Sequence, residues 1–163
     1  MSFENPVSAI RRFARKINNY REARELKGKP VHESRFVITE QHIDSQGHFN
    51  HGAQIGMMEL AARDFLDSKG LGLGELNSLD VYPMARAAKI EWLNHGVVGG
   101  DNVTVSTVLL SVGNRSTRLH QWIDKQVDGE QVKISKWTVT HVAGDRNGNP
   151  IRIPDAMRRQ LGF

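Results

Sequence analysis

The chain of 163 residues contains no cysteine. Disulfide bonds, thiolate metal sites and cysteine nucleophiles are therefore excluded. The sequence also lacks any uninterrupted apolar run approaching the roughly 18 residues that a membrane-spanning helix needs. Its N-terminus has no apolar core of the kind found in signal peptides. These absences predict a protein without a membrane span and with a cytoplasmic location.

The net charge is +4, but outside the start of the chain there is no excess of either sign of charge. Residues 1–33 hold eight Lys and Arg against four Glu, whereas residues 34–163 hold fourteen charges of each sign. Because the larger part is neutral, the basic balance does not indicate a nucleic-acid-binding domain, and we expect no nucleic-acid partner. The sequence predicts two parts, a basic N-terminal extension (residues 1–33) and one folded domain (residues 34–163).

The N-terminal extension has the pattern of an amphipathic helix over residues 6–26. Apolar side chains form one stripe, and Arg and Lys lie opposite it. We expect this helix to pack against the domain or against a partner subunit. The alternative is that it binds a membrane surface or an anionic ligand.

The domain combines one long apolar helix with several strands. A strand is expected over residues 35–43, and a helix from about His51 to Lys69, with Gly70 just past its end. The helix is apolar around most of its circumference, which is typical of a buried helix. Strands follow at residues 82–92, 103–110, 117–127 and 132–142, the last two joined by an Asp128-Gly129 hairpin. The fold class is therefore α+β, with a helix and an antiparallel sheet of about five strands covering each other.

The most informative segment is HIDSQGHFNHGAQIGMMELAAR, residues 42–63. A carboxylate, Asp44, and two imidazoles, His48 and His51, come directly before the long helix. The first turn of a helix has unpaired N–H groups and a positive dipole end, both of which favour an anion. The segment therefore predicts a catalytic or anion-binding site at the start of this helix.

This segment resembles the signature of the hotdog-fold acyl-CoA thioesterases, D-x-D-x-x-G-x-V-x-x-x-x-Y, and the pattern D-x-x-x-H-x-N-N of acyl-ACP thioesterase-like members. The matching positions are Asp44, Gly47, His48 and Asn50. The departures are His42, Gln46 and Gln54. The resemblance implies a sheet curled round the helix, a homodimer or homotetramer, and hydrolysis of acyl-CoA to a carboxylic acid and CoA. No cofactor is implied, since CoA is part of the substrate. An acyl-ACP thioesterase and a non-catalytic acyl-CoA-binding sensor are the alternatives.

Thioester hydrolysis needs an attacking oxygen and stabilisation of the carbonyl oxygen as it becomes negative. Asp44 suits the first role as general base or nucleophile, and its alternative is an ordinary loop aspartate. Backbone amides around His51 and Gly52 suit the second, and in 4-hydroxybenzoyl-CoA thioesterases the matching donor falls on His51. His48 also matches a histidine of the acyl-ACP thioesterase-like members, and His51 matches one of the YbgC-like members. Either histidine could orient water or contact the thioester carbonyl, and the alternative for each is a structural hydrogen-bonding role. Asn50, within the same oxyanion region, is expected to cap the helix.

Three further candidates lie outside the loop. Glu59 is a possible catalytic residue, because some hotdog thioesterases carry an acidic residue on this helix; the alternative is a helical salt bridge with Arg63. Arg115 and Arg118, near a turn between strands, could contact a CoA phosphate or be merely solvated. The histidines before the helix lack the spacing of a zinc site, so no metal is expected.

Overall fold

The computed structural model describes residues 22–94 and 96–163. Its five strands are β1 (His32–Val37), β2 (Tyr82–Trp92), β3 (Asn102–Val112), β4 (Ser116–Val127) and β5 (Glu130–Gly144). They form one antiparallel sheet in the order β1-β3-β4-β5-β2. The hairpin between β4 and β5 turns at Asp128 and Gly129, whose φ angles of 51° and 84° match the predicted tight turn. The predicted sheet and its hairpin are confirmed.

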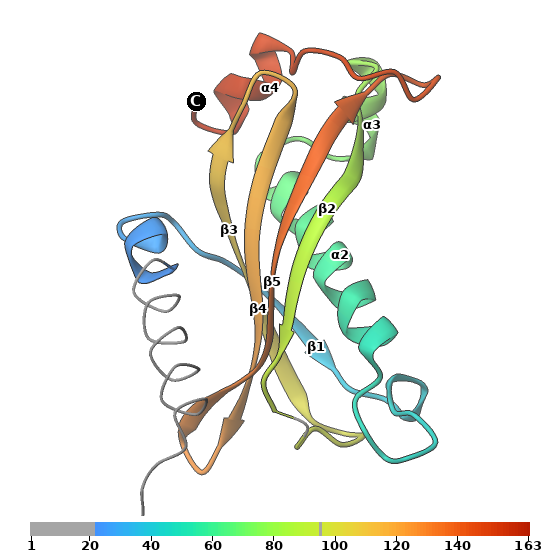
Figure 1. The fold of residues 1–163 in the computed structure, drawn as a ribbon, viewed down its shortest axis with the longest axis vertical. Helices are drawn as coiled ribbons and strands as arrows, with labels where there is room; N and C mark the ends of the chain where they lie inside the picture. Colours follow the sequence, from blue (N-terminus) through green and yellow to red (C-terminus); the bar gives the residue numbers. More distant parts are fainter. Residues whose placement is uncertain (1–21, 95) are drawn as a thin grey trace, which may run out of the picture.

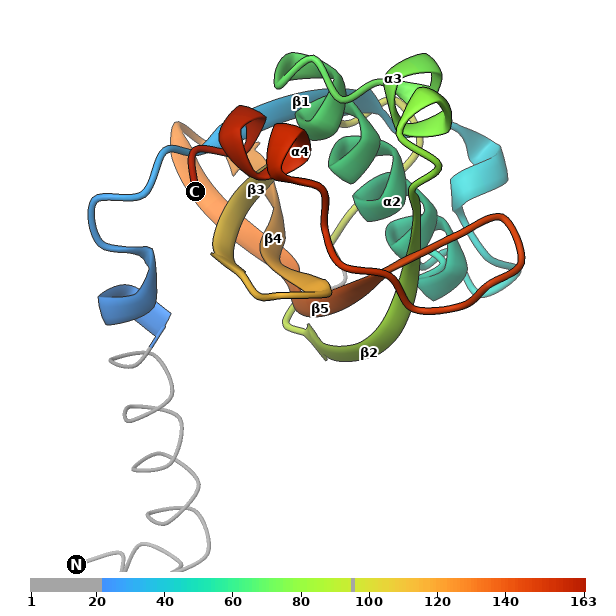
Figure 2. The same cartoon turned by 90° about the horizontal axis from the view of Figure 1, so that it is seen from above.

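The sheet curves round one long helix, α2 (His51–Ser68), as Figures 1 and 2 show. The side of the sheet that faces α2 is called the inner face, and the opposite side the outer face. Buried α2 side chains at helical spacing, Met57, Met58, Ala61, Ala62 and Phe65, pack into the core. The opposite side of α2 is open, and Leu60 on it is 53% exposed. The described residues of one chain therefore cover only one side of the central helix.

Two short helices accompany the sheet. α3 (Leu73–Ser78) follows α2 directly, and α4 (Asp155–Gln160) comes near the end of the chain. α2 ends as its sequence predicts, because Gly70 adopts a φ of 70° and the Leu71 N–H donates to the Leu66 carbonyl at 2.9 Å. α3 was not predicted, because its Gly-rich sequence has no helical signature.

The predicted first strand over residues 35–43 is wrong in its position. β1 ends at Val37, and a short 3-10 helix, η1, covers Glu40–His42. The His42 side chain causes the change, since its Nδ1 accepts from the Thr39 N–H at 2.9 Å and so favours a helical turn. The polar loop therefore begins from a turn rather than from a strand.

The N-terminal amphipathic helix was predicted over residues 6–26, and most of it lies outside the described residues. Residues 22–26 are helical. They lie on the outer face of the sheet, on the side away from α2 (Figure 2). Among the residues that the structure describes, no helix has the length and apolarity to cross a membrane. The division of the chain at residue 33 stays a prediction.

Candidate active site

The candidate site is built on the loop between η1 and α2. Ile43 pairs with Phe49 in an isolated antiparallel bridge, and the Asp44 N–H donates to the His48 carbonyl at 2.8 Å. Gly47 completes the turn with a φ of 80°, a conformation that favours glycine. Phe49 is buried at 1% exposure and fixes the loop to the core. The loop is thus a closed, anchored turn that ends at the first residue of α2.

Asp44 points one carboxylate oxygen back into this loop. Its Oδ1 accepts hydrogen bonds from the backbone N–H groups of Gln46 and His48, both at 2.9 Å. Its Oδ2 accepts no hydrogen bond from any residue that the structure describes. The bond from the His48 amide, supported by the Gln46 amide, holds the pKa of Asp44 below its usual value. Asp44 is therefore an ionised carboxylate with one oxygen fixed and one available.

Asn50 caps α2, as predicted. Its Oδ1 accepts from the N–H of Gly52 at 2.8 Å and of Ala53 at 3.2 Å. The Gly52 amide, which the sequence suggested as an oxyanion donor, is therefore engaged by the cap in this structure. Gln54 in the same turn is buried, and its side-chain amide donates to the Phe49 carbonyl at 3.0 Å. Cap and glutamine together hold the loop against the start of the helix.

His51, the first residue of α2, contacts the end of β2. Its ring lies against Trp92 with a centroid distance of 4.3 Å and an interplanar angle of 31°. Trp92 is 41% exposed and was not proposed as a site residue from the sequence. Its place as the last aromatic of a predicted strand carried no sign of this contact. The contact places an aromatic wall beside the loop that holds Asp44.

Glu59 lies two turns further along α2 and pairs with a residue that sequence analysis missed. Its Oε1 is 3.8 Å from Nε2 of His141 on β5. The His141 side chain is 10% exposed and that of Glu59 is 39% exposed. The neighbouring His141 side chain lowers the pKa of Glu59. The expected partner Arg63 contributes only a weaker charge interaction, so the strand histidine, and not the helical i, i+4 neighbour, orients this carboxylate.

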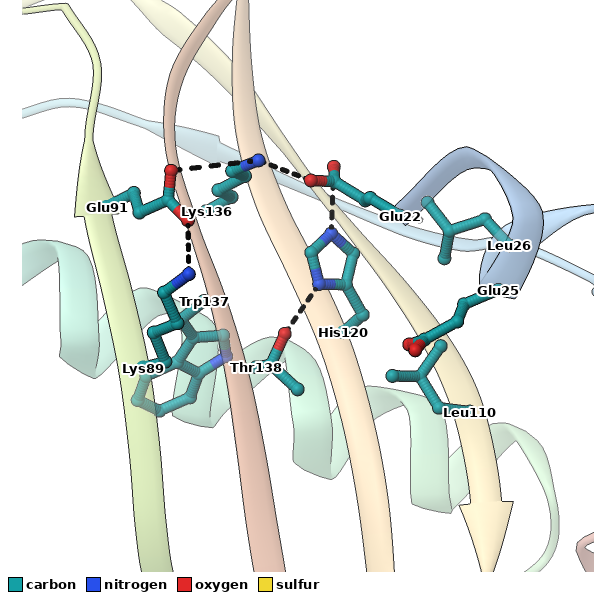
Figure 3. Close-up of a pocket in the computed structure, with 10 residues that line it drawn as sticks. All are labelled: Glu22, Glu25, Leu26, Lys89, Glu91, Leu110, His120, Lys136, Trp137 and Thr138. Atoms are coloured by element: carbon teal, nitrogen blue, oxygen red, sulfur yellow. Dashed lines mark hydrogen bonds and ion pairs between the residues drawn. The ribbon is translucent and has the colours of Figure 1, made fainter. Parts of the chain in front are cut away.

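The structure does not bring every predicted residue together. Arg115 and Arg118 belong to the β3–β4 turn and the start of β4, at the opposite end of the sheet from the start of α2 (Figure 1). Their contact with a CoA phosphate stays a prediction. Within residues 22–94 and 96–163, no group of three or more His, Asp or Glu side chains is arranged to hold a metal ion. A cavity of about 150 Å³ lies on the outer face of the sheet (Figure 3), and its lining does not include Asp44.

Comparison with known proteins gives the family context of this geometry. The model of the thioesterase-like superfamily matches residues 38–161. No curated protein matches the sequence. The match covers the loop and α2, on which the candidate site is built, and strands β2 to β5, but not β1.

Solved structures share the fold at low sequence identity. A hypothetical protein from Staphylococcus aureus, solved in complex with CoA, is 17% identical with a TM-score of 0.74, covering 82% of this chain and 83% of its own. A 1,4-dihydroxy-2-naphthoyl-CoA thioesterase from Synechocystis is 14% identical with a TM-score of 0.70, covering 82% and 96%. A putative oleoyl thioesterase from Lactobacillus plantarum is 18% identical with a TM-score of 0.74, covering 83% and 52%. At these identities the likeness establishes the hotdog fold.

Proposed function

We propose that this chain, which belongs to the thioesterase-like superfamily, hydrolyses acyl-CoA to a carboxylic acid and CoA at the start of α2. The observation that carries the proposal is the placement of Asp44. Its fixed oxygen is bound by the loop amides, and the loop ends at the N-terminus of the helix. An ionised carboxylate and a helix N-terminus are thereby supplied by one short turn, which is the pairing that thioester hydrolysis requires.

Asp44 supplies the attacking oxygen in one of two ways. As a base, Oδ2 takes a proton from water while the water oxygen bonds to the carbonyl carbon. As a nucleophile, Oδ2 bonds to that carbon itself, and water later hydrolyses the mixed anhydride. In both cases the C–S bond breaks and CoA leaves as a thiolate, which needs no strong general acid because thiols have a pKa near 8.5. The lowered pKa of Asp44 keeps the reacting oxygen ionised at neutral pH.

Backbone amides at the start of α2 stabilise the developing oxyanion. The helix dipole and the amides of His51 and Gly52 favour a negative oxygen at this position. Since the Asn50 side chain engages the Gly52 amide, the carbonyl oxygen would share or replace the Asn50 contact. Side chains of His48 and His51 then orient water or the thioester, with the Trp92 ring holding the His51 imidazole.

Glu59 is the second candidate for the reacting carboxylate. The observation that favours it is the ion pair with His141, which fixes a half-buried, ionised carboxylate on the same helix. Helical rise places Glu59 about 12 Å from His51 along the axis, too far to share one bound carbonyl within a single chain. Glu59 would therefore act on a thioester bound by the helix start of another subunit.

We further propose that the working molecule is a homodimer or homotetramer. β2 is an edge strand of 11 residues, and its residues 85–89 are exposed. Long exposed edges are usually covered, because their unpaired backbone groups bind other strands. The open side of α2 next to this edge, with Leu60 53% exposed, is a second surface that another subunit would cover.

A panel of acyl-CoAs with different acyl groups, read by release of the free thiol, tests the proposed activity. Turnover of at least one member with release of equal amounts of acid and CoA is expected. Saturable binding without turnover would assign the chain to the non-catalytic sensors instead. A parallel panel of acyl-ACPs separates the two carrier classes. Light scattering at micromolar concentration tests assembly, and a fully active monomer would refute the proposed oligomer.

A further inference from the structure

The outer face of the sheet carries a cluster of charged side chains that the proposed reaction does not use. Figure 3 shows all of its members except Lys133 in front of the strands, with α2 behind them. It joins the helical residues 22–26 to three strands. Its members are Glu22, Lys89, Glu91, His120, Lys133 and Lys136.

Glu22 is the centre of the cluster. Its carboxylate forms an ion pair with Lys136 and lies 3.3 Å from His120 Nε2 and 4.0 Å from Lys133 Nζ. The side chains of Lys136 and His120 are only 9% and 6% exposed. A buried ammonium group is costly unless a counter-charge accompanies it. The Glu22 carboxylate supplies that charge from outside the sheet.

The strands themselves supply fewer carboxylates than lysines around this site. Among the described residues, Lys136 has one other acidic partner, Glu91 at 3.8 Å, and Glu91 also pairs with Lys89 at 3.1 Å. If Glu22 were removed, the three lysines of the cluster would face two strand carboxylates, Glu91 and Asp124, and Asp124, opposite Lys133, has its pKa raised by burial. The remaining site would attract an anion, and its neighbours give it a defined geometry, since Thr138 Oγ1 lies 2.9 Å from His120 Nδ1.

We propose that His120, Lys133 and Lys136 form a carboxylate-binding site on the outer face, which holds the N-terminal segment through Glu22 and takes a free carboxylate when that segment lifts away. The segment meant here is residues 22–29, called the docked segment. Val108 of β3, opposite His120 in the β3–β4 register, is fully buried although it does not belong to the inner core.

Amide hydrogen exchange on the full-length protein tests whether Glu22 anchors the segment. Glu22→Ala should speed exchange of the amides of residues 22–29 at least about tenfold, because the segment loses the contact that closes it onto the sheet. Glu25→Ala is the matched control. It removes the same charge from the same turn, and Glu25 lines the cavity without an ion pair to any described residue. Equal exchange in both variants and the wild type would overturn the anchor.

Titration with propionate, which matches the end of a glutamate side chain, tests the site itself. The probe is the ring resonance of His120 in protein labelled with ¹⁵N-histidine, assigned by its loss in His120→Gln. In Glu22→Ala, propionate should shift this resonance in a saturable way, whereas wild type and Glu25→Ala should need at least about tenfold more propionate, because Glu22 competes within the chain. Propionamide and matched sodium chloride should have no such effect.

A second substitution shows whether the lysines form the site. Glu22→Ala combined with Lys136→Met, or with Lys133→Gln if the former does not fold, should abolish the propionate shift. Failure of propionate to shift His120 in Glu22→Ala, or equal affinity in Glu22→Ala and wild type, would overturn the proposal. None of these measurements depends on thioesterase activity.

Acid provides an independent check on the anchor. His120 and Lys136 lower the pKa of Glu22 to about 2. A carboxylate with a depressed pKa stabilises the docked segment fully at pH values above its unfolded pKa, which is near 4.3 for Glu. This stabilisation is lost only as the pH falls toward the folded pKa. Protection of the docked segment should therefore persist at about pH 4. Release of the segment at that pH, while the sheet stays folded, would contradict the assigned ion pair.

Discussion

Substitution of Asn50 tests the site, because this residue caps α2 and also lies beside the proposed oxyanion donors. Its side-chain oxygen accepts from two helix amides, those of Gly52 and Ala53, at 2.8 and 3.2 Å. Replacing such a cap by alanine typically costs about 1 kcal/mol. In a protein of this size that loss lowers Tm by about 2–4 °C. Asn50→Ser keeps an acceptor at the cap and should retain most of the stability of the wild type.

The kinetic effect of the same substitution separates the two roles. If Asn50 only caps the helix, Asn50→Ala should keep kcat within about threefold of wild type, a smaller change than loss of an acid–base group. Differential scanning calorimetry gives Tm, and thiol release on the best acyl-CoA gives kcat. An unchanged Tm in Asn50→Ala, or a failure of Asn50→Ser to restore it, would refute the cap. A loss of kcat beyond about a hundredfold in a folded protein would make Asn50 part of the reacting site.

The remaining predictions concern α2, its partner surface and the N-terminal extension. His141→Gln should raise the pKa of Glu59 toward its ordinary value, which NMR titration measures. If Glu59 takes part in catalysis, Glu59→Gln and His141→Gln should both lower kcat. If it does not, both variants should leave kcat unchanged. A Cβ added at Gly56 would have no atom within 4 Å in one chain. Gly56→Ala should therefore stabilise an isolated chain by about 0.5–1 kcal/mol in thermal unfolding. Weakened dimerisation of this variant in light scattering would show that a second subunit contacts this face of α2. Deleting residues 1–28 should leave thiol release largely intact but lower solubility or Tm, because it uncovers the outer face; a folded, dimeric but inactive product would place the extension in the site.

The sequence predicted those parts of the fold that depend on local pattern. The extent of α2 followed from its apolar periodicity and from Gly70, and the β4–β5 hairpin followed from Asp128-Gly129. The Asn50 cap was predicted from its position directly before the helix. The boundary of the first strand was wrong because a side-chain contact of His42 outweighed the alternating pattern.

Residues that depend on long-range contacts were beyond prediction from one sequence. His141 faces Glu59 only because β5 packs beside α2 in the folded sheet. Trp92 reaches His51 only because β2 ends level with the start of the helix. Glu22 looked like one acidic residue in a basic helix, and its role as a counter-charge appears only when the helix lies against β4 and β5. A weak signal existed in each case, a charged or aromatic side chain, but it did not identify the partner.

The pH dependence of hydrolysis follows from the state of Asp44. A reacting carboxylate is active when ionised, and the loop amides hold the pKa of Asp44 below its usual value. Activity that depends on Asp44 should therefore stay constant on the acidic side down to about pH 4 and fall only below it. A decline in kcat/KM between about pH 6 and 7 would instead indicate that a histidine is the reacting base.

Thiol release by Asp44→Asn tests the central claim most directly. The asparagine Oδ1 can still accept from the Gln46 and His48 amides, so the loop and Tm should be preserved while the reacting oxygen is lost. We predict a fall in kcat of roughly 10²- to 10⁴-fold. His48→Ala and His51→Ala should each cost less, because the proposed oxyanion donors are backbone amides. A folded Asp44→Asn protein with near-normal kcat would contradict the account and move the reacting group to Glu59 or to a histidine.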